Sequence, residues 1–474
     1  MAAFLIFVPL IGIITLNLPF RFLRRFAYGY AITVAAAQAA LAIFLPLPLW
    51  NRVLAHFFGL ERLDLSADRL SLVLLLSIAI VMFAALQVGC FTIRSGKRRF
   101  EFVNLVVLAV TGLNGAALVH DLFSLYVFLE VAAVASFTLI ALERDKLSLE
   151  GGFKYLVLSA VASVMLLAAI ALLLMSTGST AFAAVHAALL GSSNPMARIA
   201  VASFVAGLCI KGGLVPFHGW LPDAYTAAPA GASVLLAGIV TKTTGIYTLI
   251  RLMSSVFGPV PQIQAVLLFV GALSIIIGAT AALGQKDFKR MLAYSSISQM
   301  GYIVLGLGAG SALGVAGAVF HLFNHAVFKT LLFVNAAAVE EQTGTRDMDT
   351  MGGLSARMPV TGATSVVAFL STAGVPPLAG FWSKFIIVVA VWSAGQHAYA
   401  VIAVLASLLT CAYFLSMQRR VFFGVLAQEF KDIHEARLAI LVPEVVLALI
   451  TIGVGVMFPR VLETFILPIR SVLG

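Results

Sequence analysis

Apolar runs long enough to cross a lipid bilayer recur along the whole chain. As a helix, about 20 predominantly apolar residues match the roughly 30 Å hydrocarbon core. The 474-residue chain is 61% hydrophobic and 11% charged, with a mean hydropathy of +1.07, whereas soluble domains carry about 25% charged residues. Because lipid offers the backbone no hydrogen-bond partners, each run is expected to be a helix. We therefore predict an all-α polytopic membrane protein.

The runs predict about fourteen transmembrane helices in a single transmembrane domain that covers residues 1–474. No segment between the runs is long enough for a soluble domain. The expected helices are 1–20, 27–49, 70–93, 102–119, 122–142, 152–176, 199–215, 230–250, 261–284, 291–309, 311–338, 359–388, 398–418 and 439–459.

The basic residues are distributed unevenly between the expected loops, and the chain carries a net charge of +10. No zinc-finger spacing or basic arm accompanies this charge, so no nucleic-acid partner is expected. Positive residues favour cytoplasmic loops, which places the loops after odd-numbered helices in the cytoplasm. Those loops carry Arg21, Arg24, Arg25, Arg94, Lys97, Arg98, Arg99, Arg144, Lys146, Lys286, Lys289, Arg290, Arg346, Arg357, Arg419, Arg420, Lys431 and Arg437, and the even-numbered ones carry Arg52, Arg62, Arg69, Arg198 and Arg251.

Five further basic residues fall inside expected helices or at breaks in them. An isolated charge at the bilayer centre costs at least about 2.5 kcal/mol, so such residues usually face protein or water and act in ion transport. Burial disfavours the charged form of an ionisable group, which allows proton exchange near neutral pH. The five are Lys154, Lys211, Lys242, Lys329 and Lys384.

Glu130 is the only acidic residue in the middle of an expected helix. A carboxylate there needs a cation, and Lys211 and Lys154 are both candidates for its partner. We predict that Glu130 belongs to a proton pathway. The alternative is a structural ion pair or a protonated, hydrogen-bonded side chain.

Two helices are interrupted by glycine and proline, and lysines lie beside both breaks. Proline removes a backbone donor and clashes with the preceding turn. Lys211 precedes the break at 213–220, and Lys242 lies mid-helix, too central for its ammonium to reach the membrane surface. Lys384 follows the break at 374–380, either as the outlet of the pathway or as a cap on a half-helix C-terminus. His218 and Asp223 flank the first break and are predicted to have supporting roles, as is Lys154.

His321, His325 and Lys329 are spaced four residues apart, which places them on one helical face. Histidine titrates closest to physiological pH, so the three predict a proton relay. The alternatives are structural hydrogen bonding and a metal site, but neither a third ligand nor an HExxH motif is present. The three cysteines lack CxxC spacing, and we expect no metal and no cofactor.

Two short motifs recur in the same order in the two halves of the chain. The pair Phe153–Leu156 and Phe328–Leu331 is followed by the pair Gly213–Trp220 and Gly374–Phe381. Paired interrupted helices in repeated halves indicate an ion pathway in transporters. Chance similarity is the alternative explanation.

Six motifs together resemble the antiporter-like membrane subunits shared by respiratory complex I, Mrp-type multisubunit cation/proton antiporters and membrane-bound energy-converting hydrogenases. The most specific of them is Pro-Phe-His-x-Trp-Leu-Pro-Asp-Ala at 216–224. The others are Asp121–Glu130, Thr241–Tyr247, Gln285–Ser296, His325–Lys329 and Pro376–Lys384.

The resemblance implies inverted five-helix repeats at 101–255 (helices 4–8) and 260–420 (helices 9–13), with interrupted helices 7 and 12. Helices 1–3 then occupy 1–100, and helix 14 with the tail occupies 438–474. It implies that Glu130 pairs with Lys211 and that Lys242, His325 and Lys384 continue the path. It also implies a prokaryotic cytoplasmic (inner) membrane, other antiporter-like and small membrane subunits as partners, and peripheral iron–sulfur, hydrogenase or dehydrogenase subunits in some complexes.

We predict a proton-translocating subunit of such a complex. Sodium translocation is an alternative, although Na⁺ prefers oxygen ligands and this set holds one carboxylate against many nitrogens. A stand-alone secondary transporter is another. An oxidoreductase chain would need a GxGxxG, haem or cluster motif, and none is present, so any redox chemistry would belong to partners.

Overall fold

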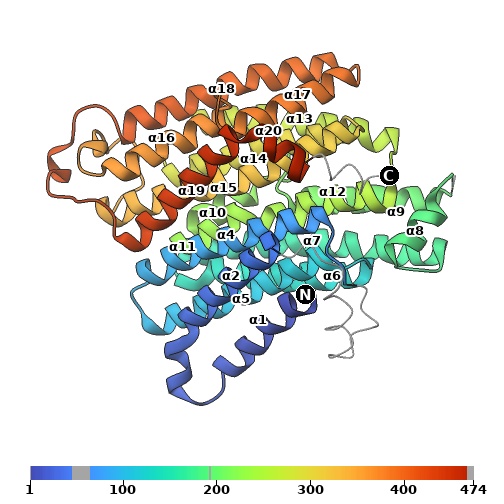
Figure 1. Ribbon diagram of the computed structural model, residues 1–474, viewed down its shortest axis with the longest axis horizontal. Coiled ribbons are helices and arrows are strands. Elements are labelled where there is room, and N and C mark those ends of the chain that lie inside the picture. Colours follow the sequence, from blue (N-terminus) through green and yellow to red (C-terminus); the bar gives the residue numbers. More distant parts are fainter. Residues whose placement is uncertain (1, 45–64, 192–193, 467–474) are drawn as a thin grey trace.

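The computed structural model describes residues 2–44, 65–191 and 194–466, and these form helices that lie side by side (Figure 1). Within these ranges there is no β-strand, and extended backbone pairs only at isolated bridges. The N-terminal helices and the C-terminal helices occupy opposite sides of the bundle in this view, with the middle of the chain between them (Figure 1).

The first half of the described chain contains the helices that carry Glu130 and Lys211. They are α1 (Ala2–Leu16), η1 (Arg21–Phe26), α2 (Ala27–Phe44), α4 (Arg69–Thr92), α5 (Gly96–Leu118), α6 (Leu122–Ile140), η2 (Ala141–Glu143), α7 (Lys146–Thr177), α8 (Phe182–Leu189), α9 (Pro195–Lys211), α10 (Trp220–Ala227), α11 (Ala230–Leu235), η3 (Leu236–Val240), η4 (Lys242–Tyr247), α12 (Thr248–Leu252) and η5 (Met253–Phe257).

The second half begins with a long helical hairpin and contains the second interrupted helix. Its elements are α13 (Pro261–Leu283), α14 (Phe288–Gly308), α15 (Ala312–Thr343), η6 (Leu354–Ala356), α16 (Pro359–Ala373), α17 (Ala379–Ser393), α18 (His397–Val421), η7 (Gln428–Phe430), α19 (Leu438–Val456), α20 (Phe458–Val461) and η8 (Leu462–Ile466).

Ten of the described helices are long and apolar enough to cross a membrane, so the chain is a polytopic membrane protein. The expected helix at 359–388 is divided into α16 and α17, and each of the two is too short to cross a membrane alone. The expected helix at 199–215 ends at Lys211 instead, because the chain turns at Gly213 with a positive φ of 63°. The expected helix at 27–49 is described to residue 44, and its remainder lies outside the described residues.

Aspartates begin several of the membrane-crossing helices. The carboxylates of Asp68, Asp121, Asp145 and Asp287 each accept a hydrogen bond from the backbone N–H three residues later. Such caps satisfy backbone donors that the first helical turn leaves unpaired, and each stabilises by about 1 kcal/mol. These four aspartates therefore mark helix ends and not the membrane interior.

Loops rich in lysine and arginine meet on one face of the bundle. Arg98 pairs with Glu143, and both Lys286 and Arg420 pair with Asp349, at 3.0 and 2.6 Å. The hydrogen bond from Lys286 lowers the pKa of the Asp349 carboxyl, and the charge of Arg420 adds to this effect. These contacts agree with the uneven charge distribution of the sequence, because they join loops expected on one side of the membrane.

Both expected helix interruptions are present, and each contains a cis X–Pro bond, at Val215–Pro216 and Pro376–Pro377. At each break, a serine hydroxyl oxygen accepts a hydrogen bond from a backbone N–H that has no helical partner. The backbone N–H of Val215 donates to Ser274 Oγ, and that of Gly380 donates to Ser371 Oγ, both at 3.1 Å. The backbone is therefore satisfied where the helix is absent, as membrane interiors require.

The two breaks offer a matched pair of glycines for substitution. A methyl group on Gly380 would stand 1.9 Å from the carbonyl oxygen of Ser371, whereas a methyl group on Gly219 would meet nothing within 4 Å. We expect Gly380→Ala to destabilise the purified protein by about 3 kcal/mol through overpacking. Thermal melting in detergent measures this effect. Gly219→Ala should melt like the parent, and equal melting of all three proteins would contradict the packing at the second break.

Candidate functional site

The ion pair between Lys211 and Glu130 joins α9 to α6. Lys211 Nζ lies 3.0 Å from Glu130 Oε1 and also donates to the hydroxyls of Ser159 and Ser163 on α7, at 3.3 and 3.2 Å. The Ser163 hydroxyl donates to the same carboxylate oxygen. Of the two candidate partners for Glu130, the structure selects Lys211.

Burial of the two charges is unequal. The Lys211 side chain is 3% exposed, whereas that of Glu130 is 31% exposed. Lys211 is the last residue of α9, where backbone carbonyls without helical partners favour a cation. Glu130 consequently lies at the edge of the bundle, where a neighbouring molecule or lipid meets the chain, and Lys211 lies inside.

Lys242 lies at the start of η4, a π-helical segment, and is fully buried. Its ammonium donates to the carbonyl oxygen of Ala237 in η3, five residues earlier. Among the described residues it has no ion-pair partner. π-Helical turns are rare and occur frequently at functional sites.

A close glycine contact places η4 against the end of α9. A methyl group on Gly245 would stand 2.3 Å from the backbone nitrogen of Gly212, the residue after Lys211. The lack of a side chain at Gly245 therefore allows the segment carrying Lys242 to pack directly on the helix end that carries Lys211.

His321 and His325 lie on α15 with stacked rings, 6.2 Å apart and inclined by 17°. His321 Nδ1 is 2.8 Å from the Ser383 hydroxyl on α17. In the described part of the chain, His321 Nε2 and both ring nitrogens of His325 are buried without a hydrogen-bond partner. Since nearly all buried polar groups are paired, these three ring nitrogens are an exception within the bundle.

Lys329 lies two turns beyond His321 and is also fully buried. Its ammonium donates to Ser295 Oγ at 2.8 Å and to the carbonyl oxygen of Leu292 at 3.0 Å, both on α14. The Tyr413 hydroxyl on α18 donates to the same serine. The expected polar face of α15 therefore divides, with the histidines near α17 and the lysine near α14.

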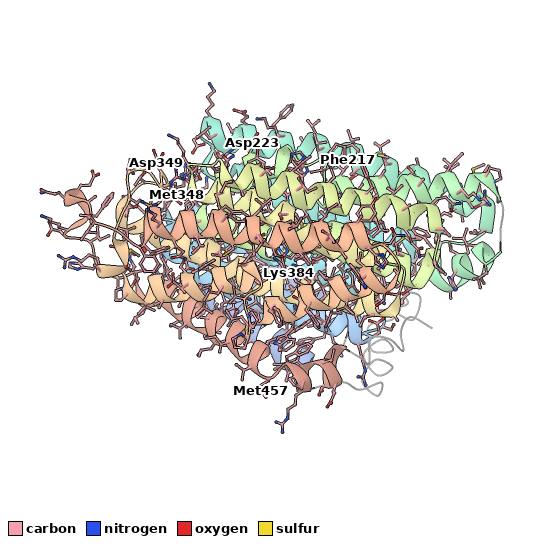
Figure 2. All side chains as sticks on the ribbon, turned by 90° about the horizontal axis from the view of Figure 1, so that it is seen from above. Phe217, Asp223, Met348, Asp349, Lys384 and Met457 are labelled. Atoms are coloured by element: carbon pink, nitrogen blue, oxygen red, sulfur yellow. The ribbon has the colours of Figure 1, made fainter. Side chains whose placement is uncertain are left out.

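Lys384 on α17 reaches back across the second break. Its ammonium donates to the carbonyl oxygen of Thr372 in the last turn of α16 at 2.8 Å, and it lies 4.4 Å from the centre of the Tyr302 ring. The contact with Thr372 is the helix-capping arrangement that the sequence left as an alternative. Figure 2 shows Lys384 within the bundle, whereas Met457 lies at its outer edge.

Three buried lysines, one from the first half of the chain and two from the second, interact electrostatically with the two histidines. Charge–charge interactions couple His325 to Lys242, Lys329 and Lys384. We call Lys242, His321, His325, Lys329 and Lys384 the buried cationic row. The Lys211–Glu130 pair continues this row toward the edge of the bundle through the contact of Gly245 with Gly212.

Lys154, His218 and Asp223 do not join the row. Lys154 is 41% exposed and pairs with Glu150 and Asp223, at 2.6 and 2.7 Å, so it is not the partner of Glu130. Arg290 binds the second oxygen of Asp223 at 2.6 Å. His218 is half-buried at the first break, and its Nδ1 has no hydrogen-bond partner among the described residues.

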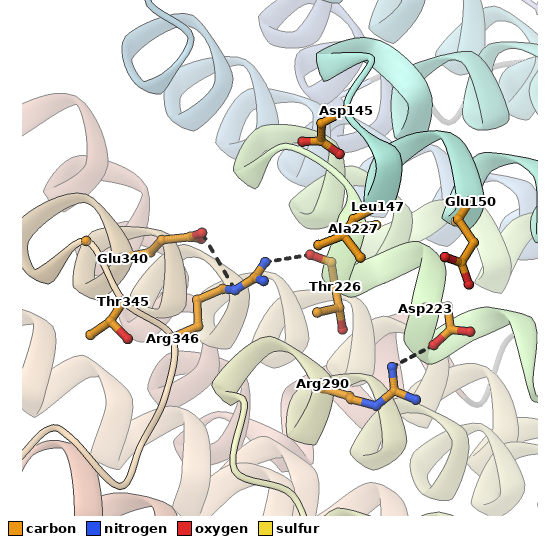
Figure 3. Close-up of a pocket in the computed structure, with 12 residues that line it drawn as sticks. Asp145, Leu147, Glu150, Asp223, Thr226, Ala227, Arg290, Glu340, Thr345 and Arg346 are labelled. Atoms are coloured by element: carbon orange, nitrogen blue, oxygen red, sulfur yellow. Dashed lines mark hydrogen bonds and ion pairs between the residues drawn. The ribbon is translucent and has the colours of Figure 1, made fainter.

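Asp223 instead lines a cavity of about 440 Å³ on the lysine- and arginine-rich face (Figure 3). Arg346 spans it, donating to the carbonyl oxygen of Thr226 at 2.7 Å and pairing with Glu340 at 3.8 Å. The lining residues are Asp145, Leu147, Glu150, Gly151, Asp223, Thr226, Ala227, Arg290, Glu340, Gly344, Thr345 and Arg346.

A polar route runs from this cavity toward Lys242. Lys289 is 3% exposed, pairs with Glu340 at 3.5 Å and donates to the carbonyl oxygen of Ala228 at 3.0 Å. The Ser233 hydroxyl lies 3.0 Å from the carbonyl oxygen of Ala228 and 2.8 Å from that of Tyr225. The Tyr225 hydroxyl lies 2.7 Å from that of Thr241, the residue before Lys242.

Three buried charged residues were missed by the sequence reasoning. Lys289 and Arg251 were assigned to loops because the predicted helix boundaries were too short by a few residues. Glu444 lies within the last expected helix, so a search of that range for acidic residues would have found it. It is fully buried on α19.

Arg251 forms a two-pronged contact with Asp68. Its Nη2 donates to Asp68 Oδ1 at 2.7 Å, its Nη1 binds the other oxygen, and it also donates to the Tyr247 hydroxyl. Burial alone would raise the pKa of Asp68, but the hydrogen bond and charge of Arg251 lower it from 3.8 to about 2. The pair ties the end of the Lys242 helix to the start of α4.

The chain is similar to known membrane subunits over most of its length. Residues 119–410 match the family described as "NADH:quinone oxidoreductase/Mrp antiporter, TM". NADH-quinone oxidoreductase subunit N of Desulforudis audaxviator is 37% identical over 71% of this chain and 67% of that protein. A Na(+)/H(+) antiporter subunit of Alkalihalophilus pseudofirmus is 34% identical over 82% of this chain and 80% of that protein.

Solved structures have the same fold. A chain of the Mrp complex from Dietzia sp. DQ12-45-1b has a TM-score of 0.86 at 24% identity and covers 100% of this chain and 99% of that chain. A chain of respiratory complex I from Thermus thermophilus has a TM-score of 0.79 at 26% identity and covers 98% of this chain and 99% of that chain.

The Asp68–Arg251 pair predicts a stability effect. We expect Asp68→Asn to lower the free energy of unfolding by about 3 kcal/mol, because it leaves the buried guanidinium without a counter-charge. Thermal melting of the purified protein measures this change. The exposed Asp432 supplies the control, and Asp432→Asn should melt like the parent. Equal melting of Asp68→Asn and the parent would show that the pair contributes nothing.

The same pair predicts a pH dependence. Since the pKa of Asp68 is lowered in the folded protein, the stability that it contributes is fully present above pH 3.8 and is lost as the pH falls through about 2. The difference in melting between the parent and Asp68→Asn should therefore narrow on acidification. A difference that stayed constant down to pH 2 would contradict the lowered pKa.

Proposed function

The chain belongs to the membrane-subunit family shared by NADH:quinone oxidoreductases and Mrp antiporters, and we propose that it translocates protons within a multisubunit complex. The complex is of the complex I, Mrp or energy-converting hydrogenase kind and lies in a prokaryotic cytoplasmic (inner) membrane. Its partners are other antiporter-like and small membrane subunits. Peripheral iron–sulfur, hydrogenase or dehydrogenase subunits join it where the driving reaction is a redox reaction.

One observation carries the proposal: the buried cationic row has no counter-charge. Lys242, Lys329 and Lys384 each donate to a backbone carbonyl, and no ion pair holds any of them among the described residues. Carbonyls stabilise an ammonium less than a carboxylate does. Each lysine can therefore lose its proton at a modest cost in free energy, which is what a relay requires.

The Glu130–Lys211 pair is proposed to couple the row to a neighbouring subunit. A proton that arrives on Lys242 adds positive charge next to the end of α9. This charge repels the Lys211 ammonium and so changes its interaction with Glu130. Glu130 is partly exposed at the edge of the bundle, so a change in its pairing is felt across the subunit contact. Coupling of this kind is reciprocal.

We also propose fourteen transmembrane helices with inverted repeats at 101–255 and 260–420, helices 1–3 at 1–100, and helix 14 with the tail at 438–474. Two similar backbone contacts support the repeats. Asp121, which caps α6, is bridged to Ala181, and Asp287, which caps α14, is bridged to Asp347. The second bridge lies among the lysine- and arginine-rich loops, whereas the first does not. Inverted repeats place equivalent loops on opposite sides of the membrane, and the two bridges fit that arrangement.

Protons suit the row better than sodium ions. Na⁺ is a hard cation that binds oxygen ligands, as Ca²⁺ and Mg²⁺ do. The row presents ammonium and imidazole groups, which repel or poorly coordinate such a cation. Sodium transport and autonomous secondary transport are the outcomes that would replace the proposal.

Purification of the intact assembly from native membranes tests the multisubunit part. Mass spectrometry should find other antiporter-like and small membrane subunits together with this chain. Additional redox subunits would identify the driving reaction, and their absence would identify an Mrp-type antiporter. A chain that purified alone and still moved ions would overturn the proposal.

Substitution of Lys242 tests the ion pathway. The assembly is reconstituted in vesicles and driven by its electron donor or, without redox subunits, by an imposed Na⁺ gradient. We expect Lys242→Met to slow proton movement by about a hundredfold, as followed with a pH-sensitive dye. Lys97→Met removes a lysine that is 78% exposed and should leave the rate unchanged. Proton movement at the parent rate in Lys242→Met would contradict the proposal.

A further inference from the structure

Glu444 is a buried carboxyl that takes no part in the buried cationic row. It has no exposed surface and lies where α19 packs on α15, α16, α17 and α4. Its Oε2 lies 3.1 Å from the Thr361 hydroxyl and 3.4 Å from the Thr364 hydroxyl, and its Oε1 has no hydrogen-bond partner among the described residues. An unpaired carboxylate in such surroundings is costly, so Glu444 requires a proton or a cation.

The charged groups around Glu444 do not supply that cation. Arg437, at the start of α19, pairs with Glu341 on α15 at 2.9 Å. The charged neighbour is Glu435, which is also acidic. No hydrogen bond or ion pair joins Glu444 to α4 or α17 in the described part of the chain.

Glu435 is arranged as the ionised member of the two carboxyls. It accepts hydrogen bonds from the backbone nitrogens of Val360 at 2.7 Å and Ala436 at 3.2 Å. Val360 is in the first turn of α16, where the helix dipole and free N–H groups favour an anion. Glu435 is also partly exposed, so its charge remains in contact with the surface.

The shared Thr361 hydroxyl favours a proton on Glu444. The Thr361 hydroxyl lies 2.8 Å from Glu435 Oε1 and 3.1 Å from Glu444 Oε2, but a hydroxyl has only one proton to donate. If Thr361 donates to the ionised Glu435, its oxygen is free to accept a hydrogen bond from Glu444. Glu444 can donate only as a carboxylic acid.

Buried polar groups connect the surroundings of Glu444 to α15, the helix that also carries Lys329. Asn335 on α15 donates to the Thr364 hydroxyl at 2.9 Å, and its own carbonyl oxygen has no partner among the described residues. Gln418 on α18 donates to Ser365 at 2.7 Å and likewise keeps an unpaired oxygen. Asn335 follows Lys329 on the same helix by six residues, a rise of about 9 Å.

We propose that Glu444 is a proton-exchange site that passes protons between the surface at Glu435 and the buried Lys329. In the inward transfer, the O–H bond of Glu444 breaks and an N–H bond forms on neutral Lys329. The carboxylate then regains a proton from the surface through Thr361. The site deepens the proposed function and rests on it, because it gives the row a second connection to the lysine- and arginine-rich face.

Infrared spectroscopy of the purified full-length chain tests whether Glu444 carries a proton. The parent should show the carbonyl band of a protonated carboxylic acid, shifted in D₂O. Glu444→Gln keeps the side-chain shape and should lose this band, whereas Glu130→Gln should retain it. A parent without the band, or a band that survives in Glu444→Gln, would overturn the proposal. Loss of the band when Na⁺ is added at constant pH would overturn it in favour of a cation site.

Proton movement by the intact assembly tests the exchange itself. We expect Glu444→Gln to slow it by about tenfold or more and Glu444→Asp to preserve most of it. Co-purification of the other subunits and unchanged melting show that Glu444→Gln has folded. If Glu444→Gln moves protons at the parent rate while Lys242→Met is inactive, only the role of Glu444 is overturned. Parent rates in both variants overturn the proposed function instead.

Discussion

An ionised side chain inside a bilayer must find a counter-charge, a hydrogen-bond partner or water, and the buried cations of this chain meet that requirement in two ways. Lys211, Arg251 and Lys289 have carboxylate partners. Lys242, Lys329 and Lys384 have backbone carbonyls instead. The paired cations connect helices, whereas the carbonyl-bound ones can give up a proton without leaving a carboxylate unpaired.

Two of the three carbonyls lie in irregular backbone. Ala237 belongs to a π-helical segment, and Thr372 lies at the end of the half-helix α16. In a regular helix, both oxygens would accept a backbone N–H four residues later, whereas a π-helix shifts that bond to the fifth residue and the end of a half-helix leaves it unmade. The interruptions therefore do more than bend the chain, because they provide ligands for the ammonium groups of Lys242 and Lys384 at the positions where the row needs them.

The sequence predicted the membrane class, the interrupted helices and the main lysines, because each leaves a one-dimensional signal such as an apolar run, a Gly–Pro break or a charge within a span. It left the partner of Glu130 open, since Lys154 and Lys211 both lie in helices near it in the chain. Only the side-chain directions show that Lys154 turns to Asp223. The π-helical backbone at Lys242 and the contact of Thr361 with both Glu435 and Glu444 depend on tertiary packing, which leaves no pattern in the sequence.

The rate of proton movement by the intact assembly carrying Lys211→Met tests most directly whether the Glu130–Lys211 pair takes part in transport. The substitution removes the cation that links the row to Glu130, whose own side chain is 31% exposed. We expect the assembly to retain all its subunits and to move protons about a hundredfold more slowly. A complete assembly that moved protons at the parent rate would show that the Glu130–Lys211 pair only holds the helices together.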